Sequence, residues 1–139
     1  MIKIKIKVLL LLFVFLTLFF QTALSQDVSL KEIYAKKQTA LKNLNIDEIS
    51  KYMSADIISE IKRQKDPKAM IFLMNYTSPI EYTTGSETFN SSTTATMEIK
   101  GKARNTKQKG STENFTGIVN FKKEGDSWKV LREDFNFGN

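Results

Sequence analysis

Apolar residues recur along this chain with two different periods. Between residues 28 and 76 they recur every three or four positions, which is the spacing of one face of a helix. Between residues 80 and 137 they recur every second position, which is the spacing of a half-buried antiparallel strand. Helices followed by strands indicate an α+β domain.

Several helical segments are predicted in the first part, and polar residues mark where they begin. Lys37 interrupts the apolar stripe of the first segment, although its long stem can lie across apolar surface. Asp47 is expected to cap a second, short helix, and Ser54 repeats this signal for the next. Asp66-Pro67 predicts a sharp helix start, because proline fits the first turn. The segment Met70 to Met74 is apolar almost all round, so we expect the most buried helix there.

Four antiparallel strands are predicted between Ile80 and Phe137. Their connections include Asn90 to Ser92 and Lys123 to Asp126, which are rich in turn-forming residues. The last strand changes phase, and a bulge between Val130 and Leu131 would explain this. On that interpretation one face carries Trp128 and Val130, and the other carries Leu131, Glu133, Phe135 and Phe137.

The first 25 residues are typical of a cleavable secretory signal. Lys3, Lys5 and Lys7 precede an apolar run over residues 8–20, and small residues stand at Ala23 and Ser25. The run is shorter than the roughly 20 residues that a spanning helix needs. We therefore expect cleavage after Ser25 and an exported domain, residues 26–139, in the periplasm or outside the cell. The alternative is an uncleaved membrane anchor.

Composition narrows the chemistry that this domain can perform. The chain has no histidine and no cysteine, which excludes an imidazole base, a thiol nucleophile, a disulfide and a His/Cys metal site. We expect no metal and no cofactor. The full chain carries a net charge of +6, but three lysines leave with the signal, so the mature balance is +3. This small excess, together with export, argues against a nucleic-acid partner.

The order of elements resembles the NTF2-like (cystatin-like) superfamily, which includes SnoaL-type and ketosteroid-isomerase-type proteins. Lys36 to Tyr52 (KKQTALKNLNIDEISKY) resembles the opening helix, break and second helix of that family. Asp66 to Tyr76 resembles its third helix, and Gly117 to Val130 (GIVNFKKEGDSWKV) resembles its final hairpin. The resemblance implies a curved sheet forming a cone roofed by helices. It does not imply one function, because this fold hosts enzymes, binders and assembly domains.

A cone of this kind would hold an apolar pocket with a few phenolic hydroxyl groups, unless the same side chains simply fill the core. Enzymes of the family use a carboxylate and a tyrosine there, but Glu81 and Glu98 alternate out of phase with the apolar residues and are expected to face water. The inward-facing candidates for a ligand pocket are Tyr34, Phe72, Tyr76, Tyr82, Met97, Phe115, Phe121 and Trp128.

Two surface features suggest partners. Lys100, Lys102 and Arg104 alternate on one strand face, either as a basic strip for an anionic partner or as the protection of an edge strand. Ile118, Leu131 and Phe135 are candidates for an apolar partner surface, through which a homodimer could form. Three functions follow from these features. We prefer a non-catalytic domain that binds a small apolar molecule or a protein; the alternatives are a SnoaL- or isomerase-like enzyme and an envelope inhibitor or immunity-type protein.

Overall fold

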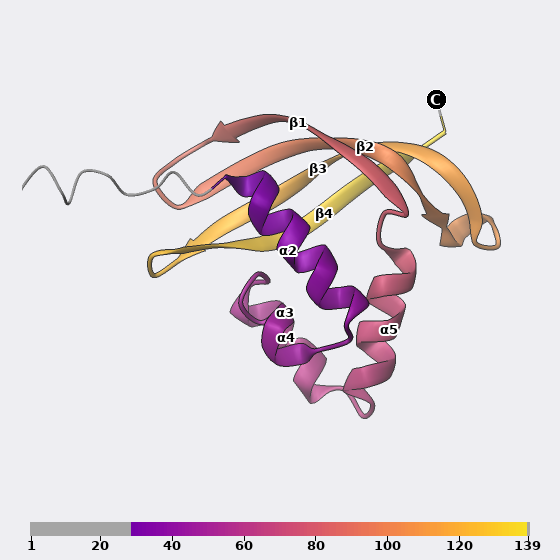
Figure 1. Ribbon diagram of the computed structural model, residues 1–139, viewed down its shortest axis with the longest axis horizontal. Helices are drawn as coiled ribbons and strands as arrows, with labels where there is room; N and C mark the ends of the chain where they lie inside the picture. The colour runs from indigo at the N-terminus through magenta and orange to yellow at the C-terminus, as the bar shows by residue number, and fades with distance from the viewer. Residues whose placement is uncertain (1–28, 139) are drawn as a thin grey trace, which may run out of the picture.

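The computed structural model describes residues 29–138, and the predicted signal segment lies outside this range (Figure 1). Within residues 29–138, four α-helices precede four strands, as the two periods of the sequence predict. Among the described residues, no helix is both long and apolar enough to cross a membrane. The helices are α2 (Leu30–Lys42), α3 (Ile46–Ile49), α4 (Ala55–Arg63) and α5 (Pro67–Thr77), and the strands are β1 (Glu81–Phe89), β2 (Thr94–Asn105), β3 (Ser111–Glu124) and β4 (Ser127–Phe137).

The four strands form one antiparallel sheet in the order β1-β2-β3-β4, which arches over α2 (Figure 1). Two glycines allow neighbouring strands to approach closely. A Cβ atom on Gly101 would lie 2.0 Å from the carbonyl oxygen of Glu81, and one on Gly117 would lie 2.4 Å from that of Asp134. No other residue type fits such a distance, and glycines placed in this way permit a sheet to bend.

Two apolar clusters hold the helices to the sheet and to one another. The first lies between α2 and the concave face of the sheet, and Tyr34, Met97 and Phe121 are fully buried in it. The second lies among the four helices and includes Leu41 and Ile71. The α+β architecture predicted from the sequence, with helices on a curved four-stranded sheet, is confirmed.

Of the three predicted side-chain caps one is confirmed and two are wrong, although Ser54 does stand at the N-cap position of α4. The carboxylate of Asp66 caps α5 by accepting from the amide of Ala69 at 3.0 Å, as expected. Asp47 does not cap α3; the side chain of Asn45 does, because it accepts from the amides of residues 47 and 48. Ser54 precedes α4, but its hydroxyl is buried without a partner among the described residues, and the carboxylate of Glu124 bonds the first helical amide instead.

Helix α5 is not the most buried helix. Only Ile71 is fully buried on it, whereas Phe72 is 60% exposed and Leu73 is 52% exposed. An apolar composition predicts burial on all sides, but α5 packs on its neighbours along one face only and leaves the other open (Figure 1).

The predicted bulge is present, but its consequence is the reverse of the one expected. Phe121 pairs with Val130 and Asn120 pairs with Arg132, so Leu131 is the extra residue on β4. The inserted residue shifts the in–out alternation of side chains along β4. Glu133, Phe135 and Phe137 therefore lie on the concave face of the sheet, the same face as Val130. Phe135, expected on the outer face, therefore packs against the core.

Candidate functional site

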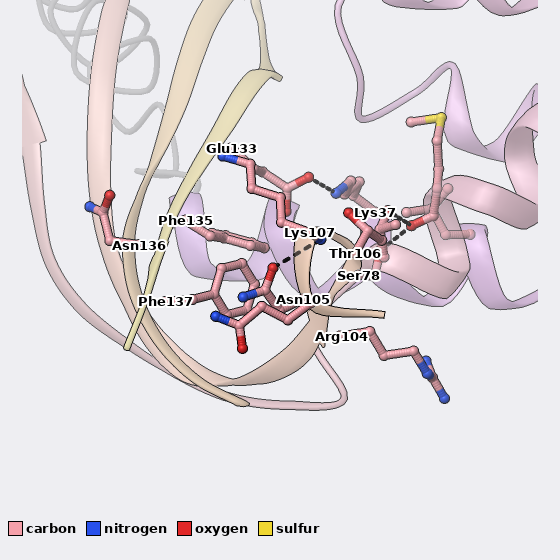
Figure 2. A pocket seen from close by; sticks show the side chains of 14 residues that line it. Lys37, Ser78, Arg104, Asn105, Thr106, Lys107, Glu133, Phe135, Asn136 and Phe137 are labelled. Carbon is pink, nitrogen blue, oxygen red and sulfur yellow. Dashed lines mark hydrogen bonds and ion pairs between the residues drawn. The ribbon is translucent and has the colours of Figure 1, made fainter. Parts of the chain in front are cut away.

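A cavity of about 560 Å³ opens between α2, the end of α5, β4 and the turn that joins β2 to β3 (Figure 2). Its lining combines charged, amide, hydroxyl and aromatic side chains. Volumes of about 300–1,000 Å³ are usual for sites that hold small molecules. The lining residues include Lys37, Arg104, Asn105, Lys107, Glu133, Phe135 and Phe137.

A carboxylate with two donors forms the base of the cavity. The ammonium of Lys37 lies 2.5 Å from Oε2 of Glu133, and the two residues point toward each other in Figure 2. The hydroxyl of Tyr34 donates to Oε1 of Glu133 at 2.5 Å, and it accepts from Nε2 of Gln38 at 2.7 Å. The Lys37 side chain is only 1% exposed and that of Glu133 is 22% exposed, so the ion pair is largely shielded from water.

Helix α2 and the β4 bulge bring these groups together. Tyr34, Lys37 and Gln38 are spaced by three and four residues, which places them on one face of α2. Glu133 reaches that face because Leu131 shifts the phase of β4. The polar cluster is thus set into the apolar stripe that faces the sheet.

The environment fixes the protonation of the tyrosine. Burial, and then the negative charge of Glu133, raise the pKa of Tyr34 well above its usual value near 10. Burial also raises the pKa of Tyr82, whose ring meets that of Tyr34 edge-on with centroids 5.2 Å apart. Tyr34 is therefore a hydrogen-bond donor at neutral pH and not a base.

One wall of the cavity is aromatic. Phe135 and Phe137 lie on the concave face of β4 and pack on Phe115, with ring centroids 4.3 and 6.2 Å apart. In Figure 2 their rings lie side by side, while Asn136 points to the other side of the strand. The alternation of β4 beyond the bulge thus gives a flat apolar surface beside the ion pair.

The opposite wall is polar and held in place. Asn105 is 5% exposed, donates to Glu113 at 2.9 Å and accepts from the amide of Lys107 at 3.1 Å. The guanidinium of Arg104 lies over the ring of Tyr76 at 4.4 Å and donates to the Tyr76 carbonyl oxygen at 3.0 Å. Arg104 points away from the ion pair in Figure 2, and Lys107 is exposed beside the cavity.

None of the eight pocket candidates from the sequence lines this cavity. Two of them, on α5, are exposed: Phe72 at 60% and Tyr76 at 39%. Trp128 is half buried and meets the ring of Phe89 edge-on at 5.6 Å, and Tyr82 is half buried against Tyr34. The other four fill the core: Tyr34, Met97, Phe115 and Phe121.

The partner-surface and basic-strip candidates are dispersed. Ile118 and Leu131 are 38% and 37% exposed, whereas the third member of that set, Phe135, faces inward. Strand β2 pairs on both sides, so the edge-strand explanation of its basic residues is wrong. Lys102 forms an exposed ion pair with Glu81 at 3.0 Å, Lys100 is exposed, and Arg104 borders the cavity.

Glu81 and Glu98 are exposed, as expected. The sequence reasoning missed Glu133 and treated Lys37 only as an interruption of an apolar stripe. A lysine in a buried apolar stripe needs a buried hydrogen-bond acceptor, and this requirement could have indicated an acidic partner for Lys37. In the described part of the chain, no group of three acidic side chains is placed to hold a metal ion.

Comparison with known proteins gives similarity of architecture only. No family model matches the chain, and no curated protein matches it. A solved ketosteroid isomerase-like protein from Erwinia carotovora atroseptica has 16% sequence identity, with 82% of this chain and 97% of that chain covered and a TM-score of 0.48. An NTF-2 like protein of unknown function from Shewanella oneidensis has 12% sequence identity, with 75% of this chain and 93% of that chain covered and a TM-score of 0.45. A SEC-C motif containing protein from Rhodopseudomonas palustris has 14% sequence identity, with 69% of this chain and 70% of that chain covered and a TM-score of 0.48.

Four helices precede a meander of four antiparallel strands, and the sheet curves around the first of those helices (Figure 1). The described part of the chain thus has an α+β fold in which helices pack on a curved four-stranded antiparallel sheet.

Proposed function

We propose that this chain is an exported, non-catalytic domain that binds a small molecule in the cavity beside Lys37 and Glu133. The observation that carries the proposal is a cavity of about 560 Å³ with a buried ion pair at its base and two phenylalanine rings on its wall. A few fixed polar groups beside an apolar wall are what a small-molecule site needs for orientation and affinity. The ligand has a polar end as well as an apolar body, which refines the wholly apolar ligand expected from the sequence.

Export is supported by the order of charge, apolar run and small residues at the N-terminus. Intact-mass measurement of the protein recovered from the producing cell tests this part. A mass that begins at Gln26 supports export with cleavage, whereas a mass that retains Lys3 to Lys7 contradicts cleavage and favours the uncleaved anchor.

An enzyme is the second candidate, because one observation favours it. The contact between Tyr34 and Glu133 joins a tyrosine to a carboxylate at the edge of a cavity, which are the two groups that ketosteroid-isomerase-type chemistry uses. However, the hydroxyl of Tyr34 and the ammonium of Lys37 each donate to one oxygen of Glu133, and both donor side chains are buried. A general base must lie within hydrogen-bond reach of the substrate proton, whereas here both carboxylate oxygens are engaged by donors of the protein itself.

Native mass spectrometry of protein purified from its own compartment tests the binding function. We expect a bound species of small-molecule mass, at one per chain, which is lost on denaturation. Thr106 lines the cavity and is exposed, so Thr106→Trp should block entry and abolish the bound species. Thr116 is exposed outside this cavity, and Thr116→Trp should retain it. A ligand that survives Thr106→Trp, or the absence of any bound species, contradicts the proposed site.

A further inference from the structure

The charges around the cavity are unequal. Three basic residues line it, Lys37, Arg104 and Lys107, against one acidic residue, Glu133. The carboxylate of Glu133 is already paired with Lys37, so the two remaining charges near an incoming molecule are both positive. A charged cleft with apolar walls raises the local concentration of molecules of opposite sign.

The polar side chains of the site are held by bonds within the protein. Each oxygen of Glu133 accepts from one protein donor, and the Asn105 side chain donates to Glu113 and accepts from the amide of Lys107. The ammonium of Lys37 carries three hydrogens, and Glu133 is its one hydrogen-bond acceptor among the described residues. Two hydrogens of this buried cation therefore have no acceptor among the described residues, which suits a ligand that accepts hydrogen bonds.

The wall opposite these donors selects the rest of the ligand. Phe135 and Phe137 present rings on the concave face of β4, and Leu41 and Met74 continue the apolar lining on the helices. Aromatic faces pack well against another ring in an offset or edge-on arrangement. This wall therefore complements a flat ring.

From these features the geometry points to one ligand class: a small aromatic carboxylate, whose carboxylate accepts from the ammonium of Lys37 and whose ring rests on Phe135 and Phe137. This assignment rests on the proposed binding function, which it makes more specific. Lys37 offsets the charge of Glu133, so the pair neither attracts nor repels the ligand strongly by its net charge, and Lys37 contributes hydrogen-bond donors. Lys107, exposed beside the cavity, adds attraction from the solvent side.

Three probes of nearly equal size test the ligand class. Benzoate, benzyl alcohol and benzylamine share a ring and differ in charge at neutral pH, so a titration followed by amide chemical shifts compares only the polar end. We expect benzoate to bind with a dissociation constant about tenfold lower than that of benzyl alcohol. Benzylamine should show no saturable binding, because its ammonium would meet basic side chains.

Amino-acid substitutions test whether the preference for benzoate arises in this cavity. Lys107→Gln should weaken benzoate binding several-fold, and Lys100→Gln, which removes an exposed lysine outside this cavity, should not. Lys37→Met should abolish the preference for benzoate over benzyl alcohol, provided that its circular dichroism spectrum is unchanged. If Lys37→Met fails to fold, the Lys107 and Lys100 pair and the three wild-type titrations decide the question.

The outcomes separate this assignment from the proposed function. Saturable binding of benzyl alcohol or benzylamine at least as tight as that of benzoate, with shifts at Phe135 and Phe137, overturns the ligand class and leaves the binding function standing. No saturable binding of any probe, together with no retained molecule in native mass spectrometry, overturns both. Equal weakening by Lys107→Gln and Lys100→Gln overturns the assignment to this cavity.

Discussion

Replacement of Lys37 by methionine is the most informative test of the buried ion pair. Methionine keeps most of the length and packing of the lysine stem but removes the charge that compensates Glu133. Loss of one partner from a fully buried pair costs about 3–5 kcal/mol, because the other charge is left uncompensated. Glu133 is 22% exposed and can recover some hydration, so we expect a loss of about 2–4 kcal/mol in the free energy of unfolding.

Urea unfolding followed by circular dichroism measures this loss, and a double-mutant cycle separates the pair from its surroundings. Glu133→Gln keeps an acceptor for Tyr34 but leaves the ammonium of Lys37 unpaired, so it should cost a similar amount. The double variant Lys37→Met/Glu133→Gln should cost less than the sum of the two, with a coupling energy of about 1.5–3 kcal/mol. Additive effects, or a Lys37→Met variant as stable as the wild type, would refute the role of the pair.

The neighbouring lysine provides a matched control. Lys36 pairs with Glu32 at 2.7 Å, but both side chains are more than half exposed. Exposed pairs within one helix contribute little to stability, so Lys36→Met should leave the urea midpoint unchanged. A similar loss in both lysine variants would attribute the effect to helix propensity or net charge and not to burial.

Three further predictions test the fold around the site. The pKa of Tyr34 is raised in the folded state, so the contribution of this residue to stability is complete below about pH 10, where the unfolded tyrosine titrates. Above that pH the contribution falls by up to about 1.4 kcal/mol per pH unit. Tyr34→Phe should lack this slope when the two proteins are unfolded in urea across that range. Ile71→Ala should cost about 2–4 kcal/mol in the same assay, whereas Phe72→Ala, at an exposed position, should cost less than about 1 kcal/mol. Gly101→Ala should lower the melting temperature strongly or prevent folding, since its Cβ would overlap the backbone of Glu81.

Each of these predictions has an outcome that contradicts it. An identical pH slope in Tyr34→Phe and the wild type would mean that the tyrosine ionises as easily in the folded chain as in the unfolded one. A larger cost for Phe72→Ala than for Ile71→Ala would mean that α5 buries its other face. A Gly101→Ala variant with an unchanged melting temperature would refute close strand approach as the origin of the bend at that residue.

The sequence predicts the architecture well because the signals that set it are local. Alternation along β2 and β3 assigns their faces correctly, and Asp66-Pro67 marks the start of α5. The prediction for α5 itself is wrong because composition reports what a helix could bury and not how much surface its neighbours supply. The capping of α4 by Glu124 joins residues 69 positions apart, and no local pattern contains it.

The candidate site was less predictable because it depends on one inserted residue. Sequence alternation places Glu133 and Phe135 opposite Val130, and the bulge at Leu131 moves both of them to the same face as Val130. The phase change was visible in the sequence, but its direction depends on pairing with β3. Lys37 was visible as an anomaly in an apolar stripe, yet its partner lies 96 positions away along the chain.

A crystal structure of the protein grown with benzoate tests the central claim most directly. We predict density for the ring against Phe135 and Phe137, with the carboxylate within hydrogen-bond distance of the ammonium of Lys37. Benzoate bound elsewhere, or a cavity closed by its own side chains while the ion pair of Lys37 and Glu133 remains intact, would contradict the claim that this cavity is the binding site.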